Sequence, residues 1–329
     1  MISASTRFFT ESDQTMNKNK LLPVESLIKL VGTDPESRKL CNTLFDVWAG
    51  VKDAETSNRL LKNLVMRYAE LEKQMRELNL ELKHSQEALL EDLAAAAEIQ
   101  KTLLPSSLPT SDKIEAAYEF IPCDKVGGDL INLFRYDDNH WLLWVLDVSG
   151  HGPRAAMVTM AVDQFLRSSS ELNYLKPIEI MRALNKEFPF SRFESFFTLV
   201  YGVVDIDRQV FTYCNSAHPK PILLQPGCRP SFIDGHGPML GLDFADTWPE
   251  VTADFSDGRG ILIYTDGLFE CSDKNGHIFG ETRLLDMLES LQEQDASGLS
   301  AAVMAEMRNF MGKIHFQDDL TFLILKSRP

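Results

Sequence analysis

The sequence predicts an α+β protein in which antiparallel sheets are covered by helices and a long helical segment precedes them. Through the C-terminal part of the chain, short runs of branched and aromatic residues follow one another at hairpin-like spacing. Pairs of helical segments interrupt these runs, which is typical of helices covering a sheet rather than of alternating parallel units. Upstream of the runs, apolar residues recur every seven positions, as in helices that associate side by side.

The helices and strands of the C-terminal part follow from residue type and periodicity. Strands are expected where branched and aromatic residues cluster, and helices where an amphipathic run follows Pro or another first-turn residue. The expected strands cover residues 114–121, 141–148, 196–206, 210–215, 221–224, 251–255, 261–265 and 320–326. The expected helices cover residues 153–172, 177–188, 281–292 and 297–311.

A heptad pattern occupies the segment ahead of the predicted sheets. Its two apolar series are Leu61, Tyr68, Met75, Leu82, Leu89 and Ala96, and Leu64, Leu71 and Leu78. The second series stops at Ser85 and Asp92, so the seam weakens toward the C-terminal domain. A helix of about forty residues spans roughly 60 Å, too long for one small domain to cover, which favours a parallel homodimer. The alternative is one amphipathic helix packed on its own chain.

These patterns divide the chain into three parts. Residues 1–58 are expected to form a helical regulatory or sensor region, with candidate helices at 24–31 and 36–49. Residues 59–104 form the coiled-coil dimerisation and linker helix, and residues 105–329 the main domain. The first part carries no motif that identifies the signal it senses.

Composition and charge favour a cytoplasmic protein. The chain has 329 residues, a formal net charge of −15 and a sequence pI near 4.9, which argues against nucleic acid or anionic lipid as partners. The first twenty residues are polar and do not resemble a signal peptide, and no apolar run is long enough to span a membrane. The five cysteines form no C-x-x-C pair and no zinc-type spacing, as expected of reduced thiols.

Four short stretches place acidic residues at strand ends, three of them beside glycine. They cover residues 126–129, 147–152, 264–267 and 318–321. Hard divalent cations prefer carboxylate oxygens on rigid supports, and glycine lets backbone and water approach the ion closely. A single Asp-Gly pair is common turn chemistry, but the four together favour a dinuclear metal site. Its candidate side chains are Asp129, Asp147, Asp266, Asp318 and Asp319.

Other kinds of catalytic site find less support in the sequence. It contains no G-x-x-x-x-G-K-[ST] loop for nucleotide phosphates and no G-x-S-x-G elbow. His151 lies in a Gly-flanked turn and is interpreted as a turn residue. His218 is flanked by turn-forming residues, and two roles stay open for it, contact with a substrate or anchoring of the turn by hydrogen bonds.

Ordered motifs from about Ala94 to the C-terminus resemble a known family. They are Glu98-Ile99-Gln100 with Leu103-Leu104-Pro105, Gly127-Gly128-Asp129, residues 147–152, Phe196-Phe197-Thr198-Leu199, Asn215-Ser216-Ala217-His218-Pro219, Gly237-Pro238-Met239-Leu240-Gly241, Thr265-Asp266-Gly267 with Glu270, and Asp318-Asp319-Leu320-Thr321. The chain thereby resembles the bacterial PP2C-like (PPM) serine/threonine phosphatases of the SpoIIE and RsbU type, which act in partner-switching control of sigma factors. The resemblance implies a four-layer α-β-β-α sandwich.

The resemblance also implies roles for the acidic residues. Asp147 would bridge two Mn²⁺ or Mg²⁺ ions, with the carbonyl of Val148 as a further ligand. Asp266 and Asp318 would serve the first ion and Asp129 the second, while Asp319 supports the site. Asp147, Asp266 and Asp318 form the implied catalytic set. The family motif usually continues with aromatic residues and another acid, whereas here Leu130, Ile131 and Asn132 follow, so altered surroundings of the second ion are expected.

By the same resemblance, residues Glu98, Gln100, Leu104 and Glu270 would couple the N-terminal region to the active site. The implied substrate is a phosphorylated STAS-domain protein, an anti-sigma-factor antagonist, and an upstream activator would bind the N-terminal region. One alternative is a catalytically degenerate phosphatase fold that acts by dimerisation and partner binding, and the altered residues after Asp129 favour it. A hydrolase of small phosphate compounds is less favoured, because no basic cluster lies beside the acidic motifs.

Overall fold

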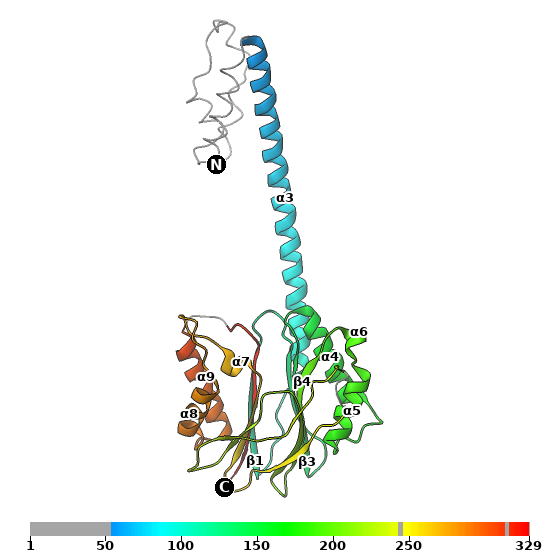
Figure 1. Cartoon of the computed structure of the whole chain (residues 1–329), viewed down its shortest axis with the longest axis vertical. Helices are drawn as coiled ribbons and strands as arrows, with labels where there is room; N and C mark the ends of the chain where they lie inside the picture. The colour runs from blue at the N-terminus through cyan, green and yellow to red at the C-terminus, as the bar shows by residue number, and fades with distance from the viewer. Residues whose placement is uncertain (1–53, 243–245, 313–315, 329) are drawn as a thin grey trace. The chain divides into compact units, whose positions relative to one another are not determined.

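A computed structural model describes residues 54–242, 246–312 and 316–328 of the chain (Figure 1). The candidate helices at 24–31 and 36–49 lie outside the described residues. Backbone contacts define a compact unit from Ala88 to Pro329. The partition at residues 58 and 104 stays a prediction. Among the helices of the described ranges, none is both long enough and apolar enough to cross a membrane.

Helix α3 (Ala54–Leu103) is continuous over 50 residues. Its sequence contains neither Gly nor Pro, and it ends two residues before Pro105, which cannot continue a helix. Residues of both predicted apolar series are exposed in the single chain, with Leu71 at 62%, Met75 at 65% and Leu78 at 65%. The predicted linker helix is therefore present, and its coiled-coil pairing stays a prediction.

Two β-sheets form the centre of the compact unit. The first has the order β1 (Ile114–Ile121), β11 (Leu320–Ser327), β10 (Gly260–Tyr264), β6 (Ile222–Leu224) and β7 (Ser231–Phe232). The second has the order β2 (Asp129–Arg135), β3 (His140–Val148), β4 (Phe197–Asp205), β5 (Val210–Ser216) and β8 (His236–Gly237), and β9 (Glu250–Asp254) also pairs with β5. Neighbouring strands are antiparallel except β5 and β8.

Three apolar clusters define the layers of this unit. Between the sheets, side chains such as Val145 of β3 and Leu323 of β11 pack face to face. Helices α4 (Pro153–Ser168) and α5 (Pro177–Glu187) cover the second sheet, and α8 (Glu281–Leu291) and α9 (Ala296–Met311) cover the first (Figure 1). Two short helices, α6 (Phe190–Phe193) and α7 (Gly267–Glu270), lie in the connections. The four-layer α-β-β-α architecture is thus confirmed.

The predicted elements match the structure with a few differences. Each expected strand and helix of the main domain has a counterpart, but the first helix ends at Ser168 rather than at residue 172. Ser169 and Ser170 follow, and serine competes with helix formation by bonding to nearby backbone. Strand β2 was not predicted, and β7 and β8 are two residues each, too short for a periodic signal.

Candidate metal centre

The acidic side chains converge where the two sheets end side by side. Asp129 opens β2 and lies directly opposite Asp147 of β3 in the antiparallel register. Asp266 follows β10, and Asp318 and Asp319 precede β11, its hydrogen-bonded neighbour. Side chains along a strand point alternately to the two faces of the sheet. Asp129 and Asp147 are on the same face as the residues of β2 and β3 that pack between the sheets. The structure therefore brings together the five predicted carboxylates from distant parts of the sequence.

Hydrogen bonds hold two of these carboxylates in fixed positions. Asp319 accepts bonds from the backbone N–H of Cys123 at 2.8 Å and of Asp129 at 3.2 Å. Thr265 Oγ1 donates to Asp129 Oδ2 at 2.8 Å. Asp319 is 3% exposed and Asp129 is 2% exposed, so protein groups rather than solvent fix the orientation of both carboxylates. The positioning role of Thr265 was not predicted, although it stands next to Asp266 in the acidic motif.

Glycine allows the close approach that this arrangement needs. A Cβ atom on Gly128 would lie 2.7 Å from the backbone oxygen of Val148, so that oxygen lies against the loop that carries Asp129. A Cβ atom on Gly267 would lie 2.0 Å from the backbone oxygen of Asp319. At distances this short, a side chain at either position would force one of the two segments to shift. The glycines of the acidic motifs thus permit the segments to meet.

Burial and mutual repulsion make three of the carboxylates, Asp129, Asp147 and Asp266, weaker acids. Burial, followed by the charges of Asp266, Asp318 and Asp319, raises the pKa of Asp147 to about 7. Burial, then Asp318 and Glu270, raises the pKa of Asp266 to about 6. The pKa of Asp129 is also raised, first by burial and then by Asp147 and Asp319. Divalent cations among these oxygens would relieve the repulsion, so the donor set fits Mg²⁺ or Mn²⁺.

The raised pKa values predict how the metal-free protein responds to pH. Between the ordinary aspartate pKa of 3.8 and about 7, folded Asp147 holds more proton than the unfolded chain, so stability falls as pH rises. In EDTA, the melting temperature should decrease from about pH 5 to about pH 8. In Asp147→Asn this decrease should be smaller, because the titrating group is gone. An unchanged pH slope in Asp147→Asn, measured by differential scanning fluorimetry, would contradict the assignment.

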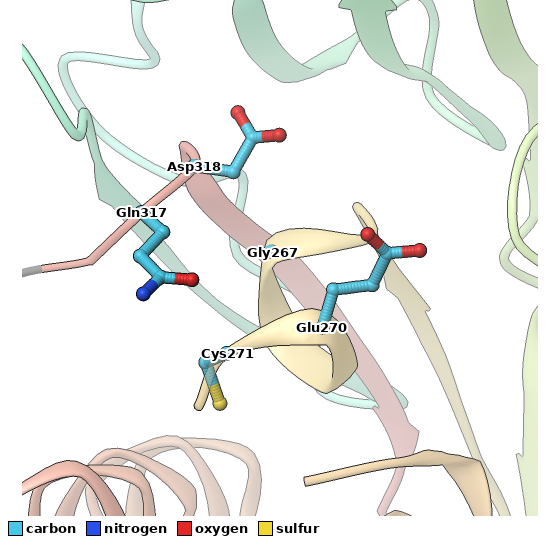
Figure 2. A pocket seen from close by; sticks show the side chains of 5 residues that line it. All are labelled: Gly267, Glu270, Cys271, Gln317 and Asp318. Atoms are coloured by element: carbon cyan, nitrogen blue, oxygen red, sulfur yellow. The ribbon is translucent and has the colours of Figure 1, made fainter. Parts of the chain in front are cut away.

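Two hollows adjoin the acidic cluster. The larger, with a volume of about 440 Å³, is lined by residues that include Asp147, Asp266 and Thr198. The smaller, of about 120 Å³, is lined by Gly267, Glu270, Cys271, Gln317 and Asp318. Figure 2 shows the carboxylates of Glu270 and Asp318 extending from neighbouring segments, with Gly267 between them. Glu270 lines both hollows, which places the predicted coupling residue beside Asp266.

Cys123 is an unexpected neighbour of the acids. Its sulfur and one carboxylate oxygen each of Asp318 and Asp319 lie within 4.8 Å of one another. Burial, followed by the charge of Asp319, raises the pKa of the thiol to about 12. A protonated thiol is a poor metal ligand, so the carboxylates remain the candidate donors. No sequence signal indicated this proximity, since Cys123 lies almost two hundred residues from Asp318.

The two histidines differ in their surroundings. His218 is fully buried, its Nδ1 lies 2.7 Å from Thr198 Oγ1, and its backbone N–H donates to Asn215 Oδ1 at 2.9 Å. Burial lowers the pKa of His218 to about 3, so the ring is neutral at physiological pH. These bonds anchor the turn, one of the two roles left open for it, and the residue also lines the larger hollow. His151 is exposed in its turn.

The residues after Asp129 have a different environment from the acids. Leu130 packs in the cluster beneath helices α4 and α5. Asn132 lies two residues further along β2 and so is on the same face of the strand. Asn132 Nδ2 donates to Asp163 Oδ1 of α4 at 3.2 Å. Asp163 is fully buried and also accepts from Arg167 Nε at 2.6 Å. Leu130 and Asn132 therefore belong to the helix-covered face of the sheet, and Ile131 packs between the sheets.

The end of helix α3 contacts the loop that carries Asp129. Gln100 is 2% exposed, its Nε2 donates to the oxygen of Gly127 at 2.8 Å, and its Oε1 accepts from the N–H of Gly127 at 3.1 Å. Leu104 packs against the clusters on both faces of the second sheet. Arg167 Nη2 donates to the oxygen of Leu103 at 2.5 Å. Glu98 is exposed and pairs with Lys101 at 2.7 Å.

Comparison with known proteins identifies the family. The family model described as "Stage II sporulation protein E (SpoIIE)" matches residues 137–328, which include four of the five acids. The phosphoserine phosphatases RsbP and RsbU of Bacillus subtilis (strain 168) are 21% identical over 240 residues and 22% identical over 251 residues. These matches cover 71% and 75% of this chain, but 57% of RsbP and 73% of RsbU.

A solved structure, the SiaA-PP2C domain of Pseudomonas aeruginosa, shares the fold. It superposes with a TM-score of 0.64 at 22% identity, and the match covers 74% of this chain and 98% of that domain. The architecture described above is therefore that of PP2C domains. With the family match spanning more than half of its length, the chain belongs to the SpoIIE family.

Proposed function

We propose that the chain is a metal-dependent protein serine/threonine phosphatase. The observation that carries this proposal is the convergence of five carboxylates at the ends of two sheets, where Asp147 and Asp266 have raised pKa values. Its relatives RsbP and RsbU, both named phosphoserine phosphatases, support the same activity. The side chains meet beside a cleft large enough for a phosphorylated side chain and its neighbours.

In this proposal each acid has a role. Asp147 lies centrally and would contact two Mn²⁺ or Mg²⁺ ions, with the Val148 carbonyl beside it. Asp266 and Asp318 would hold one ion, and Asp129 the other. Asp319 accepts the backbone N–H of Asp129 and so orients the second site. When bound, two such ions activate a water molecule for in-line attack on phosphorus and neutralise the phosphoryl oxygens.

A titration of p-nitrophenyl phosphate hydrolysis with Mn²⁺ tests the activity. We expect turnover that rises with Mn²⁺ and disappears in EDTA, because the acids have no catalytic role without cations. A catalytically degenerate binding module would give no turnover at any Mn²⁺ concentration, and that result would contradict the proposal. The sequence feature that favoured this alternative carries less weight, since Leu130 and Asn132 belong to the helix-covered face.

For the substrate, we propose a phosphorylated STAS-domain protein, in keeping with the partner-switching resemblance. The relatives RsbP and RsbU are named phosphoserine phosphatases, which supports a substrate that carries phosphoserine. An assay of phosphate release from a phosphorylated STAS-domain protein tests this substrate class directly. Turnover of p-nitrophenyl phosphate without any release from such proteins would contradict this substrate class.

We further propose that the chain forms a parallel homodimer through α3. An upstream activator would bind the N-terminal region of this dimer. Leu71, Met75 and Leu78 are more than 60% exposed in one chain, at the heptad spacing of a paired helix. Sedimentation equilibrium should give twice the monomer mass of 37.2 kDa. Replacing Leu71 and Leu78 with lysine should give monomers, and a monomeric parent protein would contradict the dimer.

Gln100 offers a direct test of coupling between α3 and the metal centre. Gln100→Ala would remove both bonds to Gly127 and leave its backbone groups unpaired, at a cost of about 1–3 kcal/mol. Gly127 lies two residues before Asp129, so half-maximal turnover should need roughly tenfold more Mn²⁺. Glu91→Ala, at an exposed position of the same helix outside the predicted coupling set, is the control. Equal Mn²⁺ dependence in the two variants would contradict the coupling.

A further inference from the structure

The cleft beside the acids also has basic side chains in its lining. Lys220 and His236 line the same hollow of about 440 Å³ as Asp147 and Asp266. Lys220 follows the turn that His218 anchors, and His236 lies on β8, opposite Asn215 in the parallel register with β5. Among the described residues that line this cleft, Lys220 is the only lysine or arginine. The fold thus supplies a basic group where the sequence motifs showed acids alone.

Lys220 of the cleft forms an ion pair with Asp234. Its Nζ lies 2.6 Å from Asp234 Oδ1, and the two side chains are 43% and 89% exposed. An ion pair this exposed contributes little to stability, because both groups remain largely hydrated. A substrate anion entering the cleft can therefore replace Asp234 at low energetic cost. The half-buried lysine is therefore paired and still accessible.

The wall of the cleft that carries Lys220 and His236 lies close to the proposed reacting position. Thr198 is opposite Asp147 in the register of β3 and β4, and its hydroxyl lies 2.7 Å from His218 Nδ1. His236 is in turn near enough to His218 to influence it electrostatically. Asp147, Thr198 and His218 thus form a short series of neighbours that leads to His236. A phosphorylated residue at the acids would place its flanking residues along this wall.

We propose that Lys220, assisted by His236, forms an anion subsite that recognises a negatively charged group of the phosphoprotein substrate. The group is a phosphoryl oxygen or a carboxylate beside the phosphorylated residue, and both offer the oxygens that an ammonium group binds. The apolar side chains of Phe232, Met239 and Phe269 line the same cleft and would contact the rest of the bound segment. This inference rests on the proposed phosphatase activity.

Two variants that break the same ion pair test the subsite. Lys220→Glu should lower kcat/KM for a phosphoserine peptide roughly tenfold, because an attractive group becomes repulsive. Asp234→Asn should raise kcat/KM about twofold or more, because it frees Lys220 from its competitor. If the pair were merely structural, both variants would shift kcat/KM in the same direction. Lys186→Glu, an exposed lysine on α5, is the matched control for the charge change.

Two synthetic phosphoserine peptides distinguish the anion, one flanked by glutamate and one by glutamine. A loss in Lys220→Glu that is confined to the glutamate peptide identifies a flanking carboxylate, and an equal loss on both identifies the phosphoryl group. Identical responses of Lys220→Glu and Asp234→Asn, or none, overturn the subsite. Mn²⁺-dependent turnover of p-nitrophenyl phosphate by the parent protein is measured alongside. If the parent protein turns over p-nitrophenyl phosphate but the two variants do not differ in kcat/KM, the subsite alone is overturned. If the parent protein shows no such turnover, both the phosphatase activity and the subsite are overturned.

Discussion

Asp147→Asn should reduce Mn²⁺-dependent hydrolysis of p-nitrophenyl phosphate by at least about a hundredfold. Asp147 lies opposite Asp129 in the strand register and within electrostatic range of Asp266, Asp318 and Asp319. An asparagine there keeps the shape but loses the charge that would hold two cations. No other described side chain occupies this central position, so the loss should not be rescued by more Mn²⁺.

The same substitution should not unfold the protein. The pKa of Asp147 is raised because its ionised form is repelled by the other acids, and a neutral amide removes this repulsion. Metal-free Asp147→Asn should therefore be at least as stable at about pH 8 as the parent, measured by thermal unfolding in EDTA. Asp138→Asn, which changes an exposed acid, is the control and should keep full turnover. Retained turnover in Asp147→Asn would contradict the assigned centre.

Gly267→Ala should have the second-largest effect. A Cβ atom at this position would lie 2.0 Å from the backbone oxygen of Asp319, and backbone cannot move aside as a flexible side chain can. Either the Asp266 segment or the Asp319 segment must shift, which should cost about 1–3 kcal/mol of stability. Because both segments carry candidate ligands, Mn²⁺-dependent turnover should fall by more than about tenfold.

Gly276→Ala is the matched control for this prediction. Gly276 has a φ of +82° and nothing near its added Cβ, so the substitution costs about 1–2 kcal/mol through backbone strain alone. Its stability loss should resemble that of Gly267→Ala, while its turnover should stay near that of the parent. Chemical denaturation and p-nitrophenyl phosphate assays on both variants separate the two effects. Equal activity losses would show that destabilisation, rather than geometry, explains Gly267→Ala.

Local sequence singled out Asp147, Asp266 and the Asp318-Asp319 pair because they stand at the ends of recognisable strands. Residues 141–148 read as a nearly continuous apolar run because both faces of β3 are buried. Asp147 interrupts this run near its end, which marks it as a candidate functional residue. The same property hides the number of layers, because a strand buried on both faces shows no alternation. Periodicity therefore predicted strands and helices, and the four layers followed from the resemblance.

Contacts between distant segments could not be predicted in this way. Strand β2 begins with Asp129 and contains Asn132, two polar residues that weaken a strand signal, yet both are 2% exposed and hydrogen-bonded. Asp163 accepts the hydrogen bond from Asn132. It lies on a predicted helix, but no sequence feature marks Asp163 itself as the partner of Asn132. The position of Lys220 and His236 in the same cleft likewise depends on a turn and a short strand that only the tertiary structure brings together.

Calorimetric titration of the metal-free protein with Mn²⁺ tests the central claim most directly. If the five carboxylates form a dinuclear centre, the parent should bind about two equivalents per chain, and binding should release protons because Asp147 and Asp266 are partly protonated near neutral pH. Asp147→Asn should lose both binding events. Absence of Mn²⁺ binding by the parent, or unchanged binding by Asp147→Asn, would contradict the metal centre and with it the proposed phosphatase.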